Sequence, residues 1–203
     1  MQYCPDISSD VEAHNQTHDL ATNGVPTTLD VIGKTLATGP FWTISLITQD
    51  DPLSQHTLLT DVALRASRSL PRSGTFRWRP YRHDSRPVLW RWLHHAYLLH
   101  TNNPGRRVIG LVFVLRRPYH YPMRWDAEHS DGIVHSPTWC VEMLWTAYNY
   151  QRTGCAASLL KTAFTHLGIE PDDASWSHPF SEAGAAVVRR FCPVQFKAYD
   201  SGQ

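Results

Sequence analysis

The stretch that decides the fold is TWCVEMLWTAYNYQRTGCAASLLKTAFTHL, from Thr138 to Leu167. Its first nine residues are mostly β-branched, aromatic or apolar, which predicts a strand over 138–146. After Gly154 the spacing becomes helical, because apolar residues recur at i, i+4 and i+7 from Leu160, and Gly168 is placed to end that helix. The stretch therefore predicts a strand, a tight turn and an amphipathic helix in succession.

The turn between them has the form Q/R-x-x-G-x-G/A and reads Gln151-Arg152-Thr153-Gly154-Cys155-Ala156. Its small residues let an anion approach the backbone, where the unpaired N–H groups and the positive end of the helix dipole converge. The pattern alone is a weak signal. Its position after an apolar strand and before an amphipathic helix favours a pyrophosphate-binding turn.

Further strand and helix patterns extend outward from this unit in both directions. We expect strands over 41–48, 95–100, 107–116, 174–177 and 194–199, helices over 52–69 and 181–191, and a short helix or turn over 29–36. The run 107–116 is apolar at consecutive positions, which is typical of a central strand covered on both faces. The order of elements predicts an α/β fold with a mixed central sheet.

Two segments stand apart from this pattern. Residues 1–26 are polar and loop-like and are expected to form an arm, with the main domain over 27–203. The segment 71–93 mixes six arginines with Trp78, Trp90 and Trp92. Such a mixture could stack nucleic-acid bases, but a surface excursion anchored by its tryptophans is the simpler interpretation.

Composition excludes several function classes. The 203 residues contain 19 Lys+Arg and 18 Asp+Glu, and the net charge of +1 argues against a polybasic nucleic-acid binder, although a local basic groove stays open. Cys4, Cys140, Cys155 and Cys192 form no CxxC pair, and no leader pattern opens the chain, so we expect a reduced cytoplasmic protein. The longest apolar run, 108–115, is too short to span a membrane.

The strand, turn and helix of 138–167 resemble the signature of the GNAT superfamily of acyl-CoA N-acyltransferases. The resemblance implies a GNAT-like mixed central sheet with helices on both faces, and acetyl-CoA as the acyl donor. It further implies that main-chain groups of Leu144, Trp145 and Thr146 bind the pantetheine. The pyrophosphate would be held at the turn by Gln151 and by the amides of Arg152, Thr153, Gly154, Cys155, Ala156 and Ala157.

The C-terminal run from Ser175 to Asp200 is similar to the end of the cohesin acetyltransferase family, in which a strand, a glycine-containing helix and a closing strand follow one another. That family begins with a zinc finger, and Cys4, His14 and His18 resemble part of its ligand set. The set is incomplete, so a degenerate finger or a plain arm are both compatible with it, and no metal site is assigned. His178 stands where the family has its catalytic aspartate.

Acetyl transfer to an amine requires a base, because an exposed amine keeps its proton at neutral pH. His178 is the first candidate, since it ends a strand beside the expected cofactor cleft; the alternative is that it caps the following helix. Glu142 is the second, an acid within an apolar strand; the alternative is an outward-facing surface residue.

The cysteines suggest a competing class, a Cys/His hydrolase. Cys155 at a helix N-terminus, or Cys192, could work with His166 or His178. Buried structural cysteines are the simpler interpretation.

These observations predict an acetyl-CoA-dependent N-acetyltransferase. Transfer would be direct, without an acyl-enzyme, to an amine acceptor that is either a protein lysine or a small molecule. The alternative is a GNAT-like module that binds nucleic acid or protein without turnover.

Overall fold

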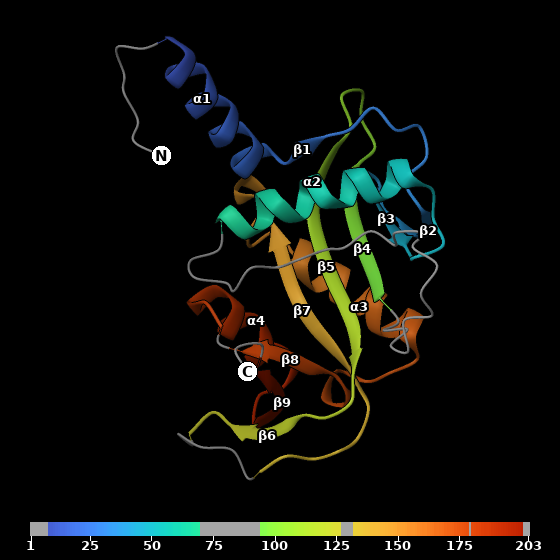
Figure 1. Ribbon diagram of the computed structural model, residues 1–203, viewed down its shortest axis with the longest axis vertical. Coiled ribbons are helices and arrows are strands. Elements are labelled where there is room, and N and C mark those ends of the chain that lie inside the picture. The colour runs from blue at the N-terminus through green and yellow to red at the C-terminus, as the bar shows by residue number, and fades with distance from the viewer. Residues whose placement is uncertain (1–7, 70–93, 127–131, 179, 201–203) are drawn as a thin grey trace, which may run out of the picture.

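The protein is described by a computed structural model over residues 8–69, 94–126, 132–178 and 180–200. The predicted Arg/Trp segment 71–93 lies outside these residues. A nine-stranded mixed sheet forms the centre, with strand order β2-β3-β4-β5-β7-β8-β9-β6 and β1 paired to β5 (Figure 1). The strands are β1 (Val25–Pro26), β2 (Lys34–Thr38), β3 (Trp42–Ile47), β4 (His94–Thr101), β5 (Arg107–Arg117), β6 (Tyr121–Arg124), β7 (Thr138–Thr146), β8 (Ser175–His178) and β9 (Gln195–Asp200).

Helices cover both faces of the sheet, as the family resemblance implied. The α-helices are α1 (Ser8–Asn23), α2 (Leu53–Ser69), α3 (Cys155–Leu167) and α4 (Glu182–Phe191), and two short 3₁₀ helices are η1 (Tyr148–Tyr150) and η2 (Pro171–Asp173). In Figure 1, α2 crosses the near face of the strands and α3 lies behind them. Gly110 of β5 lies under α3, because a Cβ there would come within 2.7 Å of Leu159.

The core is centred on β4 and β5. Residues 108–115 of β5 are all buried, which confirms the prediction of a central strand covered on both faces. All pairings are antiparallel except those of β8, which runs parallel to both β7 and β9. Parallel pairs need a crossover connection, and here α3 and α4 supply the two crossovers.

The N-terminal segment differs from the expected loop. Residues 8–23 form α1, which projects from the body at its N-terminal end (Figure 1). Its C-terminal end is attached to the sheet, because Leu20 is buried and Asp19 forms an ion pair with Nη1 of Arg107 at 2.9 Å. The helix continues into β1, which pairs with β5.

Two further expectations were wrong. The segment 29–36 was predicted to be a short helix or turn, but Leu36 lies in β2, because the hydrogen bonds of this edge strand to β3 outweigh its weak helical pattern. The segment 118–137, in which no strand was expected, contains β6, which pairs with β9 alone and so tolerates Pro122 at the edge of the sheet.

Candidate functional site

A gap in the sheet opens between β7 and β8. These strands pair only at Cys140 with Ser175 and at Val141 with Trp176. Beyond that point β8 continues along β9, while β7 runs on to Thr146 paired with β5 alone. The second half of β7 therefore offers one edge of its backbone to a ligand in extended conformation.

The turn after β7 presents amides at the end of this gap. Arg152 and Gly154 both have positive φ, 61° and 92°, and Gly154 is the N-cap of α3 without a side-chain cap. Within the described part of the chain, the amides of residues 152–157 donate to no acceptor in hydrogen-bond geometry. These donors and the helix dipole together form a site for an anion such as pyrophosphate.

Hydrogen bonds from side chains of the turn to its main chain stabilise its conformation. Thr153 Oγ1 donates to the carbonyl of Tyr150 at 2.6 Å and lies 3.2 Å from Cys155 Sγ. Gln151 Nε2 donates to the carbonyl of Thr146 at 3.3 Å. The Gln151 amide thus occupies one of the main-chain acceptors that the sequence assigns to pantetheine.

The three residues assigned to pantetheine lie on β7 where it borders the gap. Trp145 is buried, and Leu144 and Thr146 are half-buried. Their main-chain groups on the β5 side are paired, with Leu144 opposite Val112.

Glu142 is the extra residue of a β-bulge. Phe113 pairs with Met143 and the next residue, Val114, pairs with Val141, so that Glu142 has no partner of its own on β5. Bulges of this kind redirect a side chain. Glu142 therefore lies just past the last β7–β8 pair, at the closed end of the gap.

The Glu142 carboxylate is held by Arg117. Nε and Nη2 of Arg117 donate to the same oxygen, Oε1, at 2.8 and 2.6 Å, and the Glu142 side chain is only 10% exposed. It is therefore neither the surface residue of the alternative interpretation nor an isolated buried acid.

Arg117 also contacts the phenol of Tyr199, with its guanidinium 4.1 Å from the ring centroid. Burial, together with a hydrogen bond to Tyr119, raises the pKa of Tyr199 to about 12. Sequence reasoning missed Arg117 and Tyr199, because only the pairing of distant strands brings them to Glu142.

His178 lies on the face of the sheet opposite to that of Tyr199. On β8, Trp176 packs against Phe164 of α3 with ring centroids 6.0 Å apart, and His178 shares that face by strand alternation. Its ring lies 5.3 Å from that of Phe180. By contrast, Tyr199 pairs with Ser177 and so marks the other face.

The two candidate bases consequently flank the closed end of the gap from different strands and different faces. Glu142 on β7 is held by an arginine. His178 on β8 takes part in no ion pair with the residues that the structure describes.

The cysteine geometry argues against a Cys/His nucleophile. Cys155 and His166 are both on α3, eleven residues and thus about 16 Å apart, and His166 Nδ1 lies 3.0 Å from the hydroxyl of Tyr97. Burial raises the pKa of Cys192 to about 11, with Asp172 adding to the effect. Burial likewise raises the pKa of Cys140, and the charge of Glu142 raises it further, so neither thiol favours its thiolate form.

The histidines of the N-terminal segment lie one turn apart on α1. The ring centroids of His14 and His18 are 6.4 Å apart, and both residues are exposed. Cys4 lies outside the described residues. Over residues 8–69, 94–126, 132–178 and 180–200, no cluster of three or more metal-binding side chains is present.

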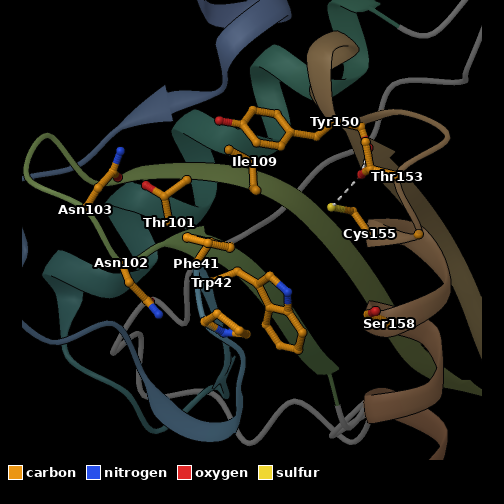
Figure 2. Close-up of a pocket in the computed structure, with 12 residues that line it drawn as sticks. Phe41, Trp42, Thr101, Asn102, Asn103, Ile109, Tyr150, Thr153, Cys155 and Ser158 are labelled. Carbon is orange, nitrogen blue, oxygen red and sulfur yellow. Dashed lines mark hydrogen bonds between the residues drawn. The ribbon is translucent and has the colours of Figure 1, made fainter.

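A pocket of about 490 Å³ lies beside the turn, on the side away from the gap. Figure 2 shows Phe41, Trp42 and Tyr150 around it, with Cys155 and Ser158 of α3 forming the opposite wall. No local sequence pattern indicates this pocket, because its walls come from four separate segments of the chain.

Comparison with known proteins places the fold. No protein-family model and no curated protein matches the sequence. The structure is similar to that of the xEco2 acetyltransferase domain bound to a CoA conjugate, with a TM-score of 0.62 and 15% identity over 84% of this chain and 99% of that chain. A second structure of the xEco2 acetyltransferase domain gives a TM-score of 0.62 and 13% identity over 85% of this chain and 100% of that one.

This likeness establishes the fold. It confirms the GNAT-like fold that the sequence resemblance implied, including the distant similarity to the cohesin acetyltransferases. Among the described helices, none has the length and apolar character needed to cross a membrane.

Proposed function

We propose that this protein is an acetyl-CoA-dependent N-acetyltransferase that transfers the acetyl group directly to an amine, from either a protein lysine or a small molecule. One observation carries the proposal: the gap beside β7 leads directly to a turn whose amides, from 152 to 157, have no acceptor among the described residues. A ligand with an extended part attached to a pyrophosphate matches both parts.

The residues present fit such a ligand. The amides of the turn would hold the pyrophosphate, and the main chain of Leu144, Trp145 and Thr146 would pair with the pantetheine after Gln151 releases the Thr146 carbonyl. When bound, acetyl-CoA would supply a thioester: the C–N bond to the amine forms, the C–S bond breaks, and CoA leaves as a thiolate that takes up a proton to become the thiol.

The proton of the attacking amine would be removed by a side chain at the closed end of the gap, where the β7–β8 pairing ends. We propose that His178 takes the proton from the attacking amine, because Glu142 already accepts two hydrogen bonds from Arg117. A direct transfer agrees with the cysteines, since Cys140, which is nearest to Glu142 along β7, is kept as a buried thiol.

Calorimetry with acetyl-CoA, followed by mass spectrometry of an amine and lysine-peptide panel, tests this proposal. We expect stoichiometric binding and an acceptor mass increase of one acetyl group. Binding without turnover on any acceptor would favour the non-catalytic module, and no binding of acetyl-CoA or longer acyl-CoAs at millimolar concentration would overturn the proposal.

A further inference from the structure

The pocket beside the turn has an aromatic and uncharged lining. Phe41 comes from the β2–β3 turn, Trp42 from the start of β3 and Tyr150 from η1. None of the lining residues carries a charged side chain. The Phe41 ring is 81% exposed although it is a large apolar group. Such a lining suits a planar, neutral ring that stacks on aromatic side chains.

Polar groups are available at the opposite wall. In Figure 2 the Cys155 thiol and the Ser158 hydroxyl of α3 point toward the pocket. A ring with nitrogen atoms at its edge could accept or donate hydrogen bonds there. Thr101, Asn102, Asn103 and Thr153 add further polar side chains, so the pocket offers a stacking surface together with hydrogen-bonding groups, as small-molecule sites do.

The pocket is continuous with the pyrophosphate turn, because Gly154 and Cys155 belong to both. The strand order β3-β4-β5-β7-β8 places the pocket and the β7–β8 gap on opposite sides of this turn. A pyrophosphate at the turn joins two groups, and when one of them lies in the gap the other lies toward the pocket.

We infer that the pocket binds the adenine ring of acetyl-CoA, stacked on Phe41 and Trp42. This inference rests on the proposed function, in which the pantetheine lies in the gap. The pocket then fixes the direction of the whole cofactor and makes this end of the sheet a determinant of its affinity.

The test compares two ligands on three proteins by calorimetry. The ligands are acetyl-CoA and S-acetyl-4′-phosphopantetheine, which lacks the adenine nucleotide. The proteins are the wild type, Phe41→Ala and the matched control Tyr148→Ala, which removes an exposed aromatic ring (71% exposed) that does not line the pocket. Phe41→Tyr keeps the stacking surface and checks that loss of the ring is the cause.

Base stacking on an aromatic side chain predicts that Phe41→Ala weakens acetyl-CoA binding about 10-fold. It should leave binding of the truncated ligand unchanged, Tyr148→Ala should change neither, and Phe41→Tyr should restore acetyl-CoA affinity. An equal effect of Phe41→Ala on both ligands would overturn the adenine assignment and leave the proposed function standing.

Two further outcomes separate the assignments. If ADP, which carries both an adenine ring and a pyrophosphate, binds the wild type and Phe41→Ala equally tightly, the pocket does not hold the adenine ring and the inference is wrong. If neither acetyl-CoA nor the truncated ligand binds the wild type, both the inference and the proposed function fail.

Discussion

The two edges of β7 have opposite characters. Along one edge, eight residues pair with β5 in a strand-to-strand contact at the centre of the core. Along the other, only Cys140 and Val141 pair with β8 before the strands separate. One strand therefore stabilises the fold on one side and leaves its backbone to a ligand on the other.

This difference predicts that the two edges respond differently to substitution. Changes at the open edge and its turn should alter binding or turnover in a protein that stays folded. Changes at the closed edge, which is the edge of β7 paired with β5, should alter the free energy of unfolding and leave the acetyl-CoA affinity of the folded protein nearly unchanged.

The largest effect is expected at the turn, from Gly154→Asp compared with Gly154→Asn. Both side chains have room, because no atom lies within 4 Å of a Cβ there, and both carry a similar backbone strain at the positive φ of 92°. They differ only in charge. A carboxylate about 4 Å from a bound phosphate costs about 4 kcal/mol at an effective dielectric of 20, so the aspartate variant should bind acetyl-CoA ~10³-fold more weakly.

The asparagine variant is the control for backbone strain and should bind within a few-fold of the wild type. Calorimetry measures both affinities, and circular dichroism checks the fold. Equal losses in the two variants would show that the conformation of the turn, rather than an anion, sets the affinity.

At the closed edge, Leu111→Ala should lower the free energy of unfolding by about 3 kcal/mol, because a fully buried leucine leaves a cavity. Leu111 pairs with Trp145 of β7. Urea denaturation measures the loss, and acetyl-CoA affinity under native conditions should stay the same. Val194→Ala, at a residue that is 70% exposed, should change stability by less than about 0.5 kcal/mol. A large loss of acetyl-CoA affinity in Leu111→Ala would contradict the separate roles of the two edges.

Much of this arrangement could be predicted from local sequence. The boundaries of β7 and α3 follow from the change of apolar spacing and from two glycines, and the structure places Gly154 and Gly168 at the ends of α3 with φ of 92° and 65°. These features depend on neighbours in the chain, so one sequence suffices to find them.

Features that depend on distant contacts were missed. The helix α1 has few apolar residues, and it is held by Leu20 and by the ion pair between Asp19 and Arg107, 88 residues further along the chain. The face of Glu142 depends on a bulge, and its partner Arg117 is set by the pairing of β5 with β7. No local pattern marks a bulge position or a cross-strand ion pair.

The two candidate bases at the closed end of the gap, His178 and Glu142, should differ in their effect on turnover. His178→Ala should lower kcat ~10² or more while acetyl-CoA affinity changes little, because a general base contributes roughly 10² to 10⁴ and does not contact the pyrophosphate. Glu142→Gln should have a smaller effect, since Arg117 holds the carboxylate. Steady-state kinetics with the true acceptor measure both.

Added imidazole provides the second measurement, because it should restore part of the rate of His178→Ala and none of that of Glu142→Gln. The reverse order of the two losses would assign the base to Glu142. Wild-type rates in both variants would mean that neither residue removes the proton.

The smallest expected effect is on the pH dependence of stability, and it arises among the strands on the β5 side of β7. His94 of β4 pairs with Leu115 of β5, and its pKa is lowered to about 4, by burial first and then by the positive charges of Arg117 and His95. An unfolded histidine has a pKa of about 6.5, so between these two values the folded protein binds fewer protons than the unfolded chain. The contribution of His94 to stability is therefore fully present above pH ~6.5 and is lost as the pH falls toward 4.

The contribution of the buried histidines to stability can be measured apart from that of the acids by the choice of pH range. The pKa of Asp19 lies below its ordinary value, chiefly because of hydrogen bonds from Asn23 and Arg107, so its contribution to stability falls away only at lower pH. A decrease in Tm between pH 7.5 and 5 then reports the buried histidines, and His94→Asn should make that decrease smaller. A Tm that is constant over this range, or an equal decrease in the variant, would show that His94 is protonated in the folded protein without cost.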